Sequence, residues 1–417
     1  SNILALDKAK IAKEESEKTL RAIDQLLEQK NLTESQRDSA NLARKEAYNL
    51  TLSAISKSLA LQAMNINTEP VLSGLFTYHS FDFNNSVSGN EDSPLIYTAS
   101  RVALNKLKGK NYNLIGKLNF MANDLFFDEE NKFIYAIDNE GYLDKWDFKN
   151  GFFDLPKHIE SIELISSLKN PAFDVFYLGN KSCSFVDSKG NLFYIDNIDK
   201  PEKVKRIANH ESLIRHVVRN GNSLISVDLY GKIVVQDLNG KLISGYLSDE
   251  EVFDIKFFNN YILFITRNKC YIADFKSQKI VHETTLNGFL RKCLVLDDKI
   301  LVSNNKGTIY QLDENLKLLN SIKFGYSPIS HMKLNADEEL LAISSSDKKI
   351  GIFRANNLDG EHLIIDNIDS QIRSLEFSES NFLIVSLENG ECRFWSTNVK
   401  NNILILSYNT DYHLLTN

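Results

Sequence analysis

The sequence predicts a mainly β protein, a seven-bladed β-propeller of four-stranded blades preceded by a small α-helical domain. The first observation behind this fold class is a seven-residue pattern, Gly-x-apolar-x-x-x-Asp, that recurs at regular spacing. The second is a helical period of apolar residues that gives way to an alternating period near residue 111. A self-similar period of ~40–45 residues in strand-rich sequence is typical of propeller blades. The copies begin at Gly141, Gly190, Gly231, Asn268, Gly307, Lys348 and Gly390.

The size and charge of the chain narrow the class of protein. The chain has 417 residues, 43% of them hydrophobic, so it can bury a large core, and its net charge is −7 with a pI near 5.7. An acidic chain lacks the basic footprint of a nucleic-acid binder, and no run approaches the ~18 apolar residues of a membrane span. We therefore expect no nucleic-acid partner and no direct membrane insertion by this chain.

The cysteines carry no sign of metal or disulfide chemistry. None has the Cys-x-x-Cys spacing of a metal site, and disulfide frameworks belong to short chains dense in cysteine. All four fall in expected strands, where free cysteine behaves as a small buried hydrophobe. We expect buried thiols, no metal and no cofactor. The four are Cys183, Cys270, Cys293 and Cys392.

The N-terminal part reads as helices. Residues 3–64 contain neither Pro nor Gly, and residues 6–30 are mostly good helix formers. Asn31–Ser35 breaks the pattern, and Thr33 can cap a second helix. A third helix follows Pro70, and a fourth follows Pro94. We therefore divide the chain into a helical coil or linker (1–32), an α-helical connector domain (33–110) and the propeller (111–417). Mixed charge on the opening helix favours a solvated coil or an oligomer seam over a membrane-surface helix.

The repeated pattern reads as the third strand of each blade. Asp138, Asp187 and Asp228 stand three residues before their glycines, where the carboxylate can accept backbone N–H groups and the glycine supplies a positive φ. Closing the ring needs one more strand, which either Tyr112–Leu118 or Ile403–Tyr408 can supply. Radial packing of such sheets leaves only short exposed edges.

The repeats resemble those of WD-repeat β-propellers over roughly residues 111–410. Trp146-Asp147 matches the dipeptide that names the family, and Phe394-Trp395-Ser396 is a variant of it. The Gly-His dipeptide of the family is absent, and the Asp that usually precedes the pattern occurs only at Asp347. These departures put the family's Asp–His–Ser/Thr–Trp hydrogen-bond network in question for most blades.

The helical part carries a second resemblance. It is similar to the helical connector that precedes the propeller in large bacterial (Bacteroidota-type) signalling proteins, which carry a STAND-type NTPase or a caspase-like module. The resemblance implies that this chain is the C-terminal sensing part of such a protein and that an N-terminal effector module is an intramolecular partner. It rests on the segments 49–63, 81–84, 93–97 and 103–107.

The sequence lacks the usual catalytic signatures, such as Gly-x-Ser-x-Gly, the phosphate-binding loop and His-Glu-x-x-His. One aligned position of the innermost strands is nevertheless rich in titratable residues. Three carboxylates converging on a channel could hold a hard cation; pairing with the cationic members is the favoured alternative, because buried charges are normally partnered. His216 and His331 could also form a catalytic pair, but satisfied polar histidines are the preferred interpretation. The position holds Asp124, Asp174, His216, Asp254, Lys292 and His331.

The neighbouring aligned position is the candidate binding site. It lies near the start of each innermost strand, at one mouth of the channel, and contains the Arg and aromatic residues that interface hot spots favour. A cationic patch there suits a carboxylate-rich or phosphorylated partner, unless each Arg pairs with an acid on its own blade. The position holds Asn123, Phe173, Arg215, Phe253, Arg291, Ser330 and Arg373. The predicted partner-binding residues are Phe173, Arg215, Phe253, Arg291 and Arg373.

The sequence therefore predicts a non-enzymatic recognition and sensor module that binds a protein or peptide partner at the channel mouth. Two alternatives remain. One is a propeller hydrolase or lyase with a carboxylate-lined channel site, and the other is a structural scaffold that oligomerises through its helices. We expect a periplasmic location if a membrane helix precedes the chain, and a cytoplasmic one otherwise.

Overall fold

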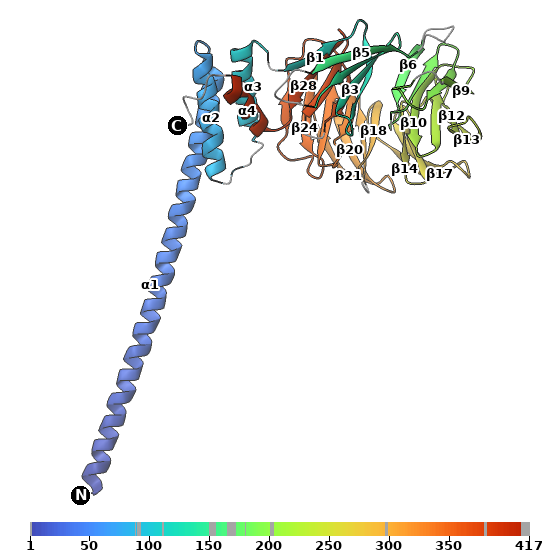
Figure 1. Cartoon of the computed structure of the whole chain (residues 1–417). Coiled ribbons are helices and arrows are strands. Elements are labelled where there is room, and N and C mark those ends of the chain that lie inside the picture. The colour runs from blue at the N-terminus through green and yellow to red at the C-terminus, as the bar shows by residue number, and fades with distance from the viewer. Residues whose placement is uncertain are drawn as a thin grey trace.

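The computed structural model describes residues 2–87, 89, 93–110, 112–149, 156–164, 172–179, 181–200, 204–296, 299–378 and 382–409, without the side chains of 2–12, 172–173, 405 and 407–409. Seven four-stranded antiparallel sheets form a ring, and a group of helices packs on one side of it (Figure 1). The predicted seven-bladed β-propeller with preceding helices is confirmed.

The N-terminal helix is longer than predicted. Helix α1 runs without interruption from Asn2 to Asn65, so the predicted break at Asn31–Ser35 is wrong. That segment contains no Pro or Gly, and the Thr33 hydroxyl donates to the Gln29 carbonyl at 2.8 Å inside the helix instead of capping a new one. Side chains 13–48 are all exposed, and α1 extends far from the ring (Figure 1). Among the described residues, no helix has both the length and the apolar composition to cross a membrane.

The shorter helices begin and end where the sequence indicates. Helix α2 (Pro70–Ser86) and helix α3 (Pro94–Lys108) each start at a proline. The first N–H groups of a helix have no partner inside the helix, so the missing N–H of proline costs no hydrogen bond there. Gly109 ends α3 in the left-handed conformation with φ 71°. A fourth helix, α4 (Val399–Asn409), follows the last strand.

The first six blades are each built from consecutive strands. The first three are β2–β5 (Ala122–Asp128, Phe133–Asp138, Tyr142–Asp147, Lys157–Glu163), β6–β9 (Ala172–Tyr177, Cys183–Asp187, Asn191–Ile195, Val204–Asn209) and β10–β13 (Ile214–Asn220, Ser223–Asp228, Lys232–Asp237, Leu242–Leu247). The next three are β14–β17 (Asp254–Phe258, Tyr261–Ile265, Lys269–Asp274, Lys279–Thr285), β18–β21 (Leu290–Leu296, Lys299–Asn304, Thr308–Asp313, Leu318–Lys323) and β22–β25 (Ile329–Leu334, Leu340–Ser345, Lys349–Arg354, Leu363–Ile365).

The seventh blade closes the ring by combining both ends of the propeller. Its strands are β26 (Ile372–Phe377), β27 (Phe382–Leu387), β28 (Glu391–Ser396) and, on the outside, β1 (Asn113–Lys117). Of the two candidate closing segments, Tyr112–Leu118 therefore supplies the strand. The rival segment, Ile403–Tyr408, lies in α4 and packs against the helices.

The repeated pattern is the third strand of every blade, as predicted. Its five opening glycines have φ between 73° and 85°. The Oδ1 atoms of Asp138, Asp187 and Asp228 each accept backbone N–H groups two and four residues later, which confirms the predicted turn chemistry. In the fifth blade, Asn304 takes the place of the aspartate, and its Oδ1 accepts the same two bonds from the N–H groups of Lys306 and Thr308. All four cysteines are buried free thiols.

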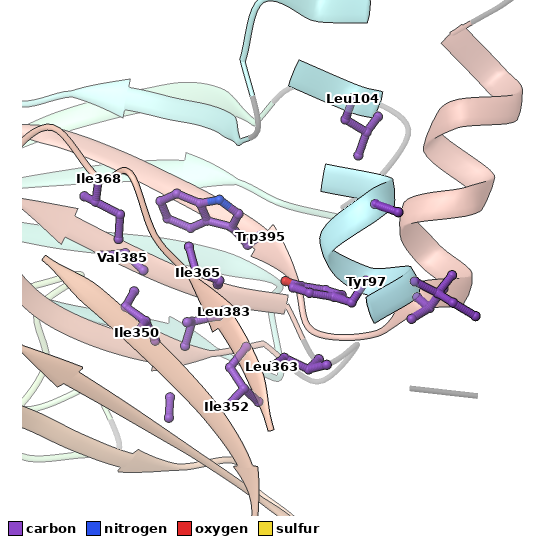
Figure 2. Packing of buried hydrophobic residues seen from close by; sticks show 14 of the residues in the cluster. Tyr97, Leu104, Ile350, Ile352, Leu363, Ile365, Ile368, Leu383, Val385 and Trp395 are labelled. Carbon is purple, nitrogen blue, oxygen red and sulfur yellow. The ribbon is translucent and has the colours of Figure 1, made fainter. Parts of the chain in front are cut away.

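The helices share a hydrophobic core with the last two blades. Buried residues of α3 and α4 pack with residues of the sixth and seventh blades, including Ile352, Leu383 and Trp395 (Figure 2). The Tyr97 hydroxyl donates to the Ser396 carbonyl at 2.7 Å, so a polar contact fixes the same joint. The helices are therefore docked on the propeller, except for the extended part of α1.

A candidate recognition site at the channel mouth

The predicted mouth residues occupy a recurrent irregularity of the backbone. In six blades the pairing of the first two strands skips one residue of the innermost strand. Such a β-bulge leaves its extra residue outside the ladder and redirects its side chain. Phe253 of the fourth blade directly precedes β14. The skipped residues are Asn123, Phe173, Arg215, Arg291, Ser330 and Arg373.

The face around this mouth is formed by two kinds of loop. The turn between the second and third strands donates a backbone N–H to the loop that precedes the same blade's innermost strand. Examples are Leu229 N to Leu213 O at 2.8 Å and Asn305 N to Phe289 O at 2.7 Å. These bonds place the turns, the loops and the bulges at one end of the channel.

Three of the five predicted binding residues line one cavity at this mouth. Arg215, Phe253 and Arg291 surround a space of about 360 Å³. The other lining residues are Asp174, Leu213, His216, Lys292, Ile329 and Ser330. Arg373 does not line the cavity, and the side chain of Phe173 lies outside the described residues.

The three arginines differ in their surroundings. Arg215 pairs with Glu251 at 3.0 Å, and both side chains are about two-fifths exposed (42% and 38%). Arg291 is exposed and makes no ion pair within the part of the chain that the structure describes. Arg373 is half-buried, and its charge acts on Asp174. The proposed pairing of every arginine with an acid of its own blade is therefore wrong for Arg215, whose partner precedes the next blade.

The channel behind the mouth contains the predicted titratable residues. Asp124, His216, Asp254, Lys292 and His331 line a space of about 280 Å³. Asp174 faces the mouth cavity instead. Among the described residues, no three His, Cys, Asp or Glu side chains converge as metal ligands would, so no described group fits the cation alternative.

The carboxylates mostly join neighbouring blades. Asp124 accepts from the Ser374 hydroxyl at 2.7 Å and from the Tyr177 N–H at 3.2 Å. Asp174 accepts from the Asn123 amide at 3.1 Å. Each bond crosses from one blade to the next, so these side chains act as staples between innermost strands.

Asp254 is the channel carboxylate that lies beside a lysine ammonium group. It accepts from the Cys293 N–H at 2.9 Å, and Lys256 Nζ lies 3.7 Å away. Burial alone raises the pKa of Asp254, but Lys256, Lys292 and His216 bring it below its usual range. The ion-pair partner of Asp254 is therefore Lys256, which is not one of the predicted partners His216, Lys292 and His331. Asp124 and Asp174 accept their side-chain hydrogen bonds from neutral donors.

The other channel groups are shifted mainly by burial. Burial raises the pKa of Asp174 to about 6, and the nearby Asp124 charge adds to the effect. Burial lowers the pKa of His216 to about 4 and that of His331 to about 3, so both rings are neutral at pH 7. His331 Nδ1 lies 3.0 Å from the Ser344 hydroxyl, which satisfies the ring as the preferred interpretation required.

The sequence alignment missed a second level of the channel. Lys333 donates to Glu376 at 2.8 Å, two residues further along the innermost strands, and Lys256 lies at the same level. Alternation within a strand places these residues on the channel side together with the first level. The aligned position two residues further along the innermost strands contains Lys256, Lys333 and Glu376, so a longer alignment would have identified them.

The third blade contains most of the hydrogen-bond network that is typical of WD repeats. His210 Nε2 lies 2.7 Å from the Ser226 hydroxyl, and Nδ1 lies 3.5 Å from Asp228. Gln236 occupies the position in the repeated pattern that holds Trp146 in the first copy and Trp395 in the last. Asn209 replaces the glycine of the family's Gly-His dipeptide, which hid this histidine from pattern matching.

Comparisons with known proteins agree with the fold. No protein-family model and no curated protein matches the sequence. The solved WD40 β-propeller domain of Doa1 is similar, with a TM-score of 0.56 and 15% identity over 70% of this chain and 98% of that one. The fold is that of a WD40-like β-propeller. A computationally designed protein, Ika8, is also similar, with a TM-score of 0.55 and 11% identity over 68% of this chain and 98% of that one.

Proposed function

We propose that this protein is a non-enzymatic recognition module that binds a protein or peptide at the channel mouth. The observation that carries the proposal is the cavity shared by Arg215, Phe253 and Arg291. Arginine and aromatic side chains are enriched among interface hot spots. Bulges present both arginines there, and a rigid ring of strands holds the bulges in place.

The bonding of the channel supports a binding function over a catalytic one. Asp124 and Asp254 use their carboxylates to hold backbone N–H groups of the next blade. His331 Nδ1 lies 3.0 Å from the Ser344 hydroxyl, and His216 lies close enough to Asp254 for the carboxylate charge to affect its pKa. A general acid or base must instead be free to reach a substrate proton.

The proposal also assigns a role to the helices. As the sensing part of a larger bacterial signalling protein, the propeller would pass its binding state to an effector module through the helices docked on the sixth and seventh blades. The shared core and the Tyr97–Ser396 bond support this coupling, because a rigid joint transmits displacement. In this proposal the propeller recognises the partner, and any chemical reaction belongs to the effector module.

A display selection tests the binding proposal. Random dodecapeptides on phage are selected against the immobilised protein, and the enriched pool is applied to a variant with Arg215→Glu and Arg291→Glu. We expect the double variant to lose the pool and an Arg206→Glu control to retain it, since Arg206 is exposed on the outer strand β9. If the double variant is folded, as judged by circular dichroism, and retains the peptide pool as well as the control does, binding at the mouth is contradicted.

A further inference from the structure

A second cavity adjoins the mouth on the same face. It has a volume of about 600 Å³ and lies between the fourth and fifth blades, where Arg267, Gly288, Phe289 and Asn305 are among its lining residues. Arg267 belongs to the turn of the fourth blade, and Phe289 belongs to the loop that enters the fifth. Neither residue is among those predicted from the sequence to bind a partner.

The loop that lines this outer cavity is held in place before any partner arrives. The Phe289 N–H donates to Asn305 Oδ1 at 3.0 Å, and the Phe289 carbonyl accepts from Asn305 N at 2.7 Å. The Asn287 carbonyl accepts from Asn304 Nδ2 at 2.9 Å and from the Tyr310 hydroxyl at 2.7 Å. A surface fixed in this way loses little conformational entropy on binding.

An aromatic pair connects the two cavities. The ring of Phe253, from the mouth cavity, packs edge-on against the ring of Phe289 with centroids 4.5 Å apart and an interplanar angle of 69°. Both rings are half-buried, so each keeps an accessible part. The Arg267 guanidinium lies 6.0 Å from the Phe289 centroid on the outer side. The mouth and the outer cavity therefore form one radial surface with an apolar centre.

Cationic groups flank this apolar centre at both ends. Arg267 and Arg291 are exposed, and neither makes an ion pair with any residue that the structure describes. Arg215 pairs with Glu251, but an ion pair this exposed to solvent contributes little to stability, so Glu251 can be exchanged for a carboxylate of the partner. Guanidinium groups bind carboxylates with paired, charge-assisted hydrogen bonds. The surface thus complements negative charge on both sides of an apolar side chain.

We infer that the partner is a short acidic peptide segment that crosses from the channel mouth to the outer cavity. An apolar or aromatic side chain of the segment packs on Phe253 and Phe289, and carboxylates on either side bind Arg215 and Arg291 inward and Arg267 outward. This inference rests on the proposed function and specifies its partner. A polynucleotide is less suited because the protein has a net charge of −7.

The test uses the peptides from the selection as fluorescein-labelled synthetic probes in anisotropy titrations. We expect enrichment of Asp and Glu around an apolar position, and weaker binding at high salt. Arg267→Glu should raise the Kd about tenfold or more, as removal of a charged hot spot does. Phe289→Ala should raise it about fivefold or more, with Phe289→Leu as a milder variant that keeps the loop packed. The Arg206→Glu control should leave the Kd unchanged.

The possible outcomes separate this inference from the proposed function. If the Arg215→Glu, Arg291→Glu variant loses the probe but Arg267→Glu and Phe289→Leu do not, the extension to the outer cavity is overturned and the mouth site stands. Enrichment of basic or uncharged peptides overturns the acidic class alone. If labelled oligothymidylate binds more tightly than the peptides and depends on the same arginines, the partner is a polynucleotide and the peptide inference is overturned. Recovery of no peptide overturns both proposals.

Discussion

The carboxylate of Asp124 accepts a hydrogen bond from the hydroxyl of Ser374 at 2.7 Å, which joins the first blade to the last. The same carboxylate accepts from the Tyr177 N–H of the second blade at 3.2 Å. One side chain thus connects three blades at the point where the ring closes. The titratable channel residues that suggested chemistry in the sequence serve, in this case, to hold the ring together.

The first prediction concerns this staple. Asp124→Ala leaves the Ser374 hydroxyl and the Tyr177 N–H without their acceptor, so we expect the free energy of unfolding to fall by about 2 kcal/mol. Urea denaturation followed by tryptophan fluorescence measures it. Asp337→Ala, at an exposed aspartate, is the matched control and should change stability by less than about 0.5 kcal/mol. Equal effects of the two substitutions would show that the staple contributes nothing.

The second prediction concerns the pH dependence of Asp174. Its pKa in the folded protein is about 6, above the ordinary 3.8, chiefly because of burial. The folded state therefore holds the proton more tightly than the unfolded state, and the cost of ionisation is absent below pH 4, grows as the pH rises and is complete above pH 6.

Asp174→Asn imitates the protonated acid. Its Oδ1 can still accept from the Asn123 amide and from the Val175 N–H, both of which now bond to Oδ1 of the aspartate. At pH 7.5 the variant should be more stable than the unmodified protein by about 1–3 kcal/mol, and the difference should vanish near pH 4. Denaturant titrations at both pH values check this, and a less stable variant at pH 7.5 contradicts it.

The third prediction compares two glycines that share a positive φ. A Cβ on Gly190 would lie 2.0 Å from the Ser212 carbonyl oxygen, whereas a Cβ on Gly221 would meet no atom within 4 Å. Both substitutions to alanine incur the backbone cost of about 1–2 kcal/mol. Only Gly190→Ala adds a clash with fixed backbone, for a total of about 3 kcal/mol or more. Similar melting temperatures for the two variants would refute this account of why the repeated pattern begins with glycine.

The repeated pattern was a sufficient guide to the fold because its residues perform local tasks. A glycine that must take a positive φ and an aspartate that accepts turn N–H groups recur in the sequence at fixed spacing. Aligning the blades on these residues also located the innermost strands. The mouth residues Arg215 and Arg291 were found in this way. Their presentation by bulges was not, because a bulge depends on the pairing register of two strands.

Features that depend on distant contacts were missed. The outer cavity combines a turn of one blade with a loop of the next. Arg267 directly precedes the fourth copy of the pattern and Phe289 directly precedes β18, so neither lies at the two aligned positions of the innermost strands that were examined for function. The continuity of α1 was also missed, because Asn31–Ser35 has the composition of a cap and a helix signal is weak where no packing decides. The closing strand β1 could be proposed but not chosen, since pairing with β28 spans nearly the whole propeller.

The last prediction concerns the joint between helices and propeller. Arg101 is only 5% exposed, and its guanidinium donates to the Ile364 carbonyl at 2.7 Å and lies 3.6 Å from the Asp366 carboxylate. Arg101→Ala removes the donor that holds outer strand β25 to α3 and should lower the free energy of unfolding by about 2–3 kcal/mol. Hydrogen exchange should quicken in α3 and β25 while β10–β13 stay protected. The exposed Arg37→Ala serves as control, and unchanged exchange in both elements of the Arg101 variant would argue against a coupled joint.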